Sequence, residues 1–381
     1  IYVLILKPSS DLIELAKKED APVYLAIGKI LNTIGIGIAT SIWGDVPYSQ
    51  INNPNLYPNP VFDTQESIYG KMLNNLNEAI NLLNEVNATG VLPKGDDFIF
   101  NGNTVKWQKT AYALKARYFM HLVKINEAYY DSAQNALNYA YKSNEDNCLI
   151  RFQNGQPEVQ APLYLERTTT RDTEVDPVFG SLLQKTLKDP REKFYSLVSS
   201  SLYSGTRAQY GPLYAMPDSY FPIITYEEGQ FLQTEIAMKK GGKIAAEVYL
   251  KEAMMASLAR VCKNPAGSAD SVNKNYVAAI PDSILTQYIE QRGTISSLSD
   301  EDAWKTIFQQ KYIALFLQLE IWNDYRRTEK YVSDIKGLPV IKPRDGNQLP
   351  RRYSYSGNEI NFNKNAPPNP GIFERIWWDV P

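Results

Sequence analysis

The sequence predicts a mostly α-helical protein built from stacked helical hairpins, with a loop-rich segment between two of them. Apolar residues recur every three or four positions over several long stretches, which is the period of an amphipathic helix. Alanines and glycines occupy the positions where neighbouring helices would meet. Segment 144–222 has no sustained period and is rich in Pro, Gly, Ser and Tyr, so we expect it to carry the binding surface.

Residues 21–43 form the most apolar long stretch of the chain. Lys29, Asn32 and three glycines interrupt it, so it predicts a buried helix rather than a bilayer span. The overall composition agrees with a globular protein, since hydrophobic residues make up 44% and charged residues 22%.

Residues 63–83 have the pattern of an amphipathic helix. Asp63 is the expected N-cap and 87–90, with the sequence Asn-Ala-Thr-Gly, the expected stop. One face of the helix is apolar and consists of Ile68, Met72, Leu76, Ile80 and Leu83.

Two helical hairpins follow. The first joins a helix over 107–122 to one over 129–140, where alanines allow close approach. The second spans 227–260, with Gly241 and Gly242 as its turn. Two such hairpins indicate a tetratricopeptide-like stack, with only an approximate 34-residue repeat.

From Ser299 the chain is again expected to be helical, with one apolar stripe that consists of Phe308, Tyr312, Leu315, Leu319 and Trp322. After Arg327 it is loop-like. We therefore expect one domain, with a helical scaffold over about 11–142 and 223–328, a loop-rich insert over about 144–222 and a loop-rich C-terminal segment, 329–381.

Charge and residue usage exclude several functions. The formal charge is −2, so no basic surface would recruit nucleic acid or anionic lipid. Cys148 and Cys262 are 114 positions apart, which excludes a disulfide framework and a zinc ribbon. His121 is the single histidine and lies in an apolar helical stretch, so we interpret it as a satisfied core or helix-surface residue.

Carboxylate pairs give little support for an enzyme. Asp96–Asp97, Glu227–Glu228 and Asp300–Asp302 are adjacent residues, whose side chains usually diverge, whereas glycoside hydrolysis needs two carboxylates facing each other across a cleft. We expect no catalytic residues, no cofactor and no metal ligands. A structural calcium ion stays open at an Asp-rich loop, although no EF-hand-like spacing occurs.

Several stretches, in order, resemble the SusD/RagB family, and more closely its SusD-like type 2 branch. Residues 43–49, Trp-Gly-Asp-Val-Pro-Tyr-Ser, are similar to that family's WGDVPYSEA signature. Four later stretches also resemble family motifs: residues 106–117, 221–228 (Phe-Pro-Ile-Ile-Thr-Tyr-Glu-Glu), 321–328 (Ile-Trp-Asn-Asp-Tyr-Arg-Arg-Thr), and 349–361 with the Trp377-Trp378-Asp379 ending. In the first of these, Tyr112 replaces the family's Asn.

The resemblance implies a lipoprotein on the extracellular face of a Bacteroidetes outer membrane. It would bind a glycan and deliver it to a TonB-dependent, SusC-like transporter. The lipid-bearing cysteine would lie upstream of Ile1, in an N-terminal segment missing from this chain. Some relatives bind peptide, so a peptide-binding member and a protein-only helical-repeat adaptor remain alternatives.

The signature itself has an architectural interpretation. Gly44 would free the backbone after a helix, Asp45 would accept backbone N–H groups and Pro47 would fix a turn. Arg326 and Arg327 are expected to form ion pairs at a helix C-terminus.

Glycan capture needs aromatic planes and forked polar groups. The candidate ligand-binding residues are exposed loop residues: Tyr57, Tyr203, Arg207, Tyr210, Tyr214 and Tyr220.

Overall fold

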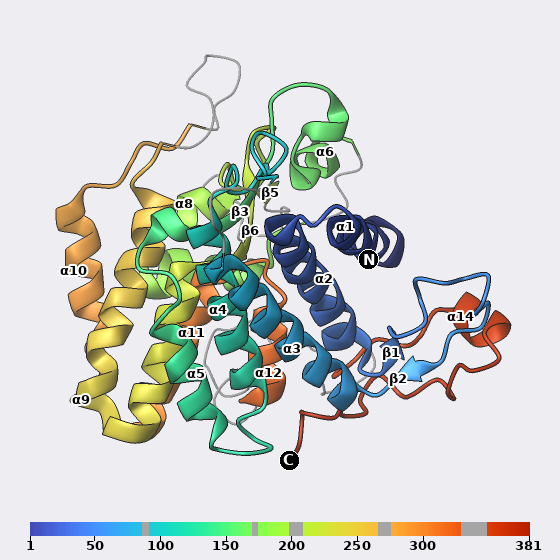
Figure 1. The fold of residues 1–381 in the computed structure, drawn as a ribbon. Coiled ribbons are helices and arrows are strands. Elements are labelled where there is room, and N and C mark those ends of the chain that lie inside the picture. The colour runs from blue at the N-terminus through green and yellow to red at the C-terminus, as the bar shows by residue number, and fades with distance from the viewer. Residues whose placement is uncertain (86–90, 170–173, 198–208, 266–275, 329–348) are drawn as a thin grey trace. The chain divides into compact units, whose positions relative to one another are not determined.

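The computed structural model describes residues 1–85, 91–169, 174–197, 209–265, 276–328 and 349–381. Helices dominate these residues, which confirms the predicted fold class (Figure 1). The chain divides into two compact units. Of the described residues, unit 1 contains 1–140, 322–327 and 349–381, and unit 2 contains 141–321 and 328. The assignment of the chain to one domain stays a prediction.

Unit 1 is a succession of helices in which each packs against the next. A π-helical turn, Tyr2–Leu6, leads into α1 (Lys7–Lys18), and α2 (Pro22–Trp43) follows. Among the described helices, α2 alone is long and apolar enough to cross a membrane, and 72% of that window is buried inside the protein. The prediction of a buried helix over 21–43 is therefore confirmed.

Helix α3 (Gln65–Asn84) begins one residue later than the sequence predicted. Thr64 is its N-cap, because the Thr64 hydroxyl accepts the backbone N–H of Ser67. The prediction of Asp63 as the N-cap is wrong. The predicted stop at 87–90 lies outside the described residues.

Helices α4 (Thr104–His121) and α5 (Tyr129–Leu137) form the first predicted hairpin. Ala111 and Ala133 are fully buried, as close helix packing requires. His121 is buried too, and its Nδ1 lies 2.8 Å from the Tyr69 hydroxyl. The interpretation of His121 as a satisfied core residue is confirmed.

The signature that follows α2 builds a tight connection. Gly44 has φ +80°, a conformation that side chains disfavour, and it ends α2. Asp45 accepts the backbone N–H of Gln65 at 2.7 Å, as predicted. Pro47 does not form a turn; it lies in β1 (Val46–Pro47), which pairs antiparallel with β2 (Phe62–Asp63).

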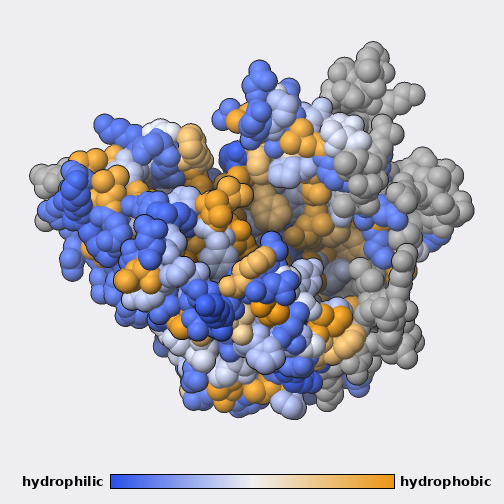
Figure 2. Space-filling model, turned by 90° about the vertical axis from the view of Figure 1, so that its right-hand side faces the viewer, coloured by the Kyte–Doolittle hydropathy of each residue, from blue (hydrophilic) through white to orange (hydrophobic). Residues whose placement is uncertain are grey.

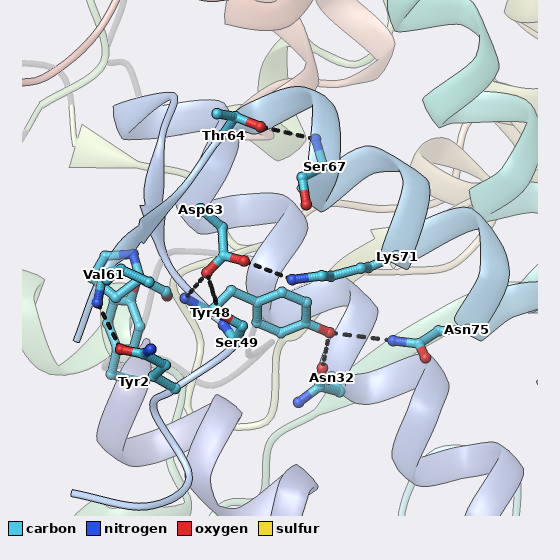
Figure 3. A network of polar contacts seen from close by, with 12 residues as sticks. Tyr2, Asn32, Tyr48, Ser49, Val61, Asp63, Thr64, Ser67, Lys71 and Asn75 are labelled. Carbon is cyan, nitrogen blue, oxygen red and sulfur yellow. Dashed lines mark hydrogen bonds and ion pairs between the residues drawn. The ribbon is translucent and has the colours of Figure 1, made fainter. Parts of the chain in front are cut away.

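Asp63 and Tyr48 connect this small sheet to the helices (Figure 3). Asp63 accepts the backbone N–H groups of Tyr48 and Ser49, at 3.0 and 2.8 Å, and pairs with Lys71 of α3 at 2.6 Å. Burial alone would raise the pKa of Asp63, but these bonds outweigh it and hold the pKa below its usual value. The Tyr48 hydroxyl donates to Asn32 of α2 at 2.7 Å.

The C-terminal segments of unit 1 close around Arg326 of α12 (Glu320–Arg327). This guanidinium is fully buried and lies 4.0 Å from the Trp322 ring centroid and 4.8 Å from that of Trp378. It donates to the carbonyl oxygens of Ser41 and Arg351, at 2.7 and 2.8 Å.

Arg327 forms the predicted ion pair with Asp324 of the same helix, at 2.6 Å. The last described helix of unit 1 is α14 (Gly357–Phe362).

In unit 2, α9 (Tyr226–Cys262) is interrupted at Gly242, which has φ +76° and ψ −171°. Arg260 nevertheless lies 2.5 Å from Glu227, 33 residues earlier. A straight helix would separate them by about 50 Å, at 1.5 Å per residue. The segment therefore folds back as the second predicted hairpin, with its turn at the predicted glycines. Helices α10 (Asp282–Gly293) and α11 (Asp300–Ala314) pack against it.

The stripe expected to continue from Phe308 to Trp322 belongs to two helices, α11 and α12, not one. Leu317, between them, has φ +68°, which no continuous helix contains. The sequence gives no glycine or proline signal at this break.

Segment 144–222 contains short helices and strands instead of loop alone. The helical pieces are Asn144–Asp146, Pro157–Val159, α6 (Pro162–Thr168), α7 (Pro177–Ser181), Leu182–Leu187 and α8 (Glu192–Tyr195). Strand β3 (Cys148–Arg151) pairs with β6 (Tyr220–Ile224), and β4 (Ser196–Leu197) pairs with β5 (Gln209–Tyr210), both antiparallel.

Replacing Gly44 with Ala should destabilise the protein by roughly 2–3 kcal/mol, because an L side chain disfavours this backbone conformation. The added Cβ would also lie 3.2 Å from Ile376 Cγ2. Gly70→Ala is the matched control, since a Cβ at this position in α3 meets nothing within 4 Å. That control should stabilise the protein by about 0.5–1 kcal/mol. Urea unfolding of both variants measures the change in the free energy of unfolding. Equal changes in the two variants would contradict the requirement for glycine at position 44.

Replacing Arg326 with Met should cost roughly 3–5 kcal/mol, because two buried carbonyl acceptors lose their donor and two indole rings lose the guanidinium. Arg151→Met is the control, because Arg151 is exposed, and should change the free energy of unfolding by less than about 0.5 kcal/mol. A loss at Arg326 no larger than at Arg151 would refute the central role of Arg326.

Candidate functional site

Four of the six predicted binding residues lie in the described part of the chain. Tyr203 and Arg207 lie outside it. Tyr57 belongs to unit 1, and Tyr210, Tyr214 and Tyr220 belong to unit 2.

The three unit 2 tyrosines converge on one aromatic cluster. Tyr210 and Tyr214 have ring centroids 6.2 and 6.3 Å from that of Phe316, and Tyr220 packs edge-on against Tyr214 at 6.3 Å. Tyr195 stacks parallel to Tyr214 at 6.1 Å. Residues from β5, the turn after it, β6 and the turn after α11 therefore meet at one place.

The backbone that presents Tyr210 is held by a close approach at Gly211. A Cβ at Gly211 would lie 2.3 Å from the Phe194 carbonyl oxygen, so only glycine fits. The Gly211 N–H donates to the Tyr195 carbonyl at 2.7 Å.

The three tyrosines differ in exposure, and this decides what each can contact. Tyr210 and Tyr220 are half-buried, so part of each ring reaches solvent. Tyr214 is only 3% exposed and supports the other rings from beneath. Burial raises the pKa of Tyr214 to about 12, against the opposing effect of Arg260.

A buried ion pair fixes Tyr220. Arg260 of α9 pairs with Glu227 at 2.5 Å and donates to the Tyr220 hydroxyl at 3.0 Å. Its guanidinium carbon lies 5.9 Å from the Tyr220 ring centroid. The Tyr220 ring is thus held from one side by a charge that is itself neutralised.

Sequence reasoning missed Phe316, Tyr312 and Arg260. Phe179 bridges the first two, with ring centroids 4.8 Å from Phe316 and 5.6 Å from Tyr312. Burial raises the pKa of the half-buried Tyr312 to about 12. Tyr312 and Arg260 belong to helices, and Phe316 lies just after α11. Their sequence patterns are those of ordinary helices and do not indicate a contact with the loop tyrosines.

Tyr57 lies in a loop of unit 1 that packs on the segment after α14. The Asn365 amide donates to the Asn59 carbonyl at 2.6 Å, and the Asn363 amide donates to the Pro60 carbonyl at 2.9 Å. Tyr57 is 37% exposed.

On the face drawn in Figure 2, hydrophobic residues are scattered among hydrophilic ones.

The adjacent carboxylates have structural partners. Asp97 accepts the Trp107 indole N–H at 2.8 Å, and Glu227 pairs with Arg260. Asp300–Asp302 form the first turn of α11, where the helix dipole stabilises negative charge. No group of three or more His, Cys, Asp or Glu residues that could hold a metal ion occurs among the described residues.

Comparison with known proteins places the chain in a family. The family model described as "Starch-binding associating with outer membrane", SusD-like type 2, matches residues 1–356. No functionally curated protein sequence matches the chain at a significant level.

Solved structures share the fold. A chitin-binding protein matches with TM-score 0.78 and 21% identity, over 99% of this chain and 85% of that one. A SusD homologue from Bacteroides fragilis matches with TM-score 0.75 and 19% identity, over 98% and 88%. A chitin-binding SusD homologue from Flavobacterium johnsoniae matches with TM-score 0.73 and 21% identity, over 98% and 84%.

At these identities the structural matches concern the fold alone. The sequence model carries the assignment, because it covers nearly the whole chain, including the signature after α2. The chain belongs to the SusD-like type 2 family.

Proposed function

We propose that this protein binds a glycan on the extracellular face of the outer membrane and passes it to a TonB-dependent, SusC-like transporter, without bond chemistry. An N-terminal lipid upstream of Ile1 would anchor it. The observation that carries the proposal is one aromatic cluster, in which Tyr210 and Tyr214 pack near Phe316 and Tyr220 packs on Tyr214, in a member of a family described as starch-binding.

The geometry suits a sugar ring. A pyranose has an apolar face that packs on an aromatic plane, and hydroxyls at its rim that need hydrogen-bond partners. Tyr210 and Tyr220 supply partly exposed rings, and the Tyr220 hydroxyl is already held by Arg260. Binding would therefore order few side chains, which limits its entropic cost.

The ion pair beneath the rings fits binding better than catalysis. Glu227 lies 2.5 Å from Arg260 and is fully buried. A general acid or nucleophile must reach the scissile bond, and a carboxylate in this position does not. The same scaffold could hold a peptide, and the ligand panel below separates the two classes.

Replacing Tyr220 with Ala should weaken binding of the preferred oligosaccharide at least about tenfold, the loss of an aromatic anchor worth about 1.4 kcal/mol. Calorimetry against chitin-derived, starch-derived and peptide ligands measures it. Tyr220→Phe keeps the ring and loses only the hydroxyl, so most of the affinity should remain.

Tyr276→Ala is the matched control, because Tyr276 is a 46% exposed tyrosine of the same unit outside the aromatic cluster. It should bind like the unaltered protein. Equal losses in the Tyr276 and Tyr220 variants would contradict the proposed site, and binding of peptides alone would replace the glycan with a peptide ligand.

Prolonged incubation with each bound polysaccharide should release no reducing sugar. Turnover that disappears in Glu227→Gln would refute the non-catalytic proposal.

Co-purification with the β-barrel transporter from the same gene neighbourhood tests the delivery step. Failure of the two proteins to co-purify when they are produced together would refute it.

A further inference from the structure

The α4/α5 hairpin of unit 1 carries a second set of aromatic rings, in addition to the cluster in unit 2. Tyr112 stacks on Tyr139 with ring centroids 5.1 Å apart and planes 29° from parallel. Phe119 stacks on Tyr129 at 5.7 Å and 20°. Tyr139 is 64% exposed, and the other three rings are half-buried.

The two ring pairs lie at opposite ends of one strip. Tyr112 and Phe119 are seven residues apart on α4, about 10 Å along the helix at 1.5 Å per residue, and they lie on the same face. Their partners are Tyr139, which follows the C-terminal end of α5, and Tyr129, its first residue, as an antiparallel hairpin requires. Figure 1 shows α4 and α5 side by side.

Lys115 lies between the ring pairs, one turn from each on the same face of α4. Its ammonium is 5.7 Å from the Tyr112 ring centroid. Among the described residues, Lys115 has neither a carboxylate partner nor a hydrogen bond. The side chain is half-buried, and α4 contains no Asp or Glu that could neutralise it.

A half-buried ammonium without a partner is unfavourable, and burial accordingly lowers the pKa of Lys115. Elsewhere in unit 1 a comparably buried lysine has a carboxylate: Lys29 pairs with Glu78 at 2.6 Å. An anion at Lys115 would supply the missing partner, and the flanking rings offer flat apolar surface on either side.

We propose that the strip formed by Tyr112, Lys115, Phe119, Tyr129 and Tyr139 is a second carbohydrate site, selective for an acidic oligosaccharide. Two sugar rings pack on the two aromatic pairs, and a carboxylate or sulfate of the chain binds the Lys115 ammonium. The site shares no residue with the unit 2 cluster, so it extends the proposed function without depending on the same side chains.

The test uses the whole chain and three probes: an oligogalacturonate, a sulfated heparin-derived oligosaccharide and a neutral chitin oligosaccharide. Calorimetry of the unaltered protein should show binding of at least one acidic probe, weakened by added salt because the contact is ionic. Lys115→Met should weaken that binding about tenfold, and Tyr139→Ala should weaken it as well. Lys7→Met, at an exposed ion pair with Asp11 of α1, is the control and should have no effect.

Tyr220→Ala should leave acidic binding intact, which separates this site from the proposed glycan site. If Tyr220→Ala changes no affinity for any glycan while Lys115→Met still does, the proposed function at the unit 2 cluster fails and the second site stands. The inference is overturned if no acidic probe binds at millimolar concentration, if Lys115→Met binds it unchanged, or if the strip binds only the neutral probe or only a protein.

Discussion

The guanidinium of Arg326 organises unit 1. A charge removed from water is costly unless hydrogen bonds and polarisable neighbours replace the solvent, and Arg326 is fully buried. Its partners come from separate parts of the chain: Trp322 from its own helix, the Ser41 carbonyl from the end of α2, the Arg351 carbonyl, and Trp378 near the C-terminus. No single segment can satisfy this group, so the charge is stable only when all of them are in place.

This constraint explains why the family motifs are far apart in sequence yet occur together. The Tyr355 hydroxyl donates to the Asp45 carbonyl at 2.8 Å, and the Tyr353 N–H donates to the Ile42 carbonyl at 2.9 Å. Arg351 in turn pairs with Asp379 at 2.6 Å. The signature after α2, the arginine pair of α12 and the C-terminal motifs are therefore contacts of one core. The signature has an architectural role, as its residues alone suggested.

The helical part of this fold was predictable because period and capping are local. The positions of α2, of the α4/α5 hairpin and of the turn at Gly242 all followed from spacing and glycine. The N-cap of α3 was misassigned because Asp63 and Thr64 both have capping side chains. Tertiary bonds decided between them, since Lys71 and the backbone of Tyr48 occupy the carboxylate of Asp63. The break at Leu317 has no local signal at all.

The candidate site shows where sequence reasoning ends and why. Loop composition identified Tyr210, Tyr214 and Tyr220 as candidates, but it did not indicate which of them reaches solvent. That depends on Phe316 and Arg260, which lie at least 40 residues further along the chain. Arg260 is neutralised by Glu227, so the charge beneath Tyr220 can hold a hydroxyl without attracting anions strongly. Lys115 in unit 1 has no such carboxylate among the described residues. Similar aromatic surfaces can therefore favour neutral sugars in one unit and acidic sugars in the other, according to whether the cation beside the rings is already paired.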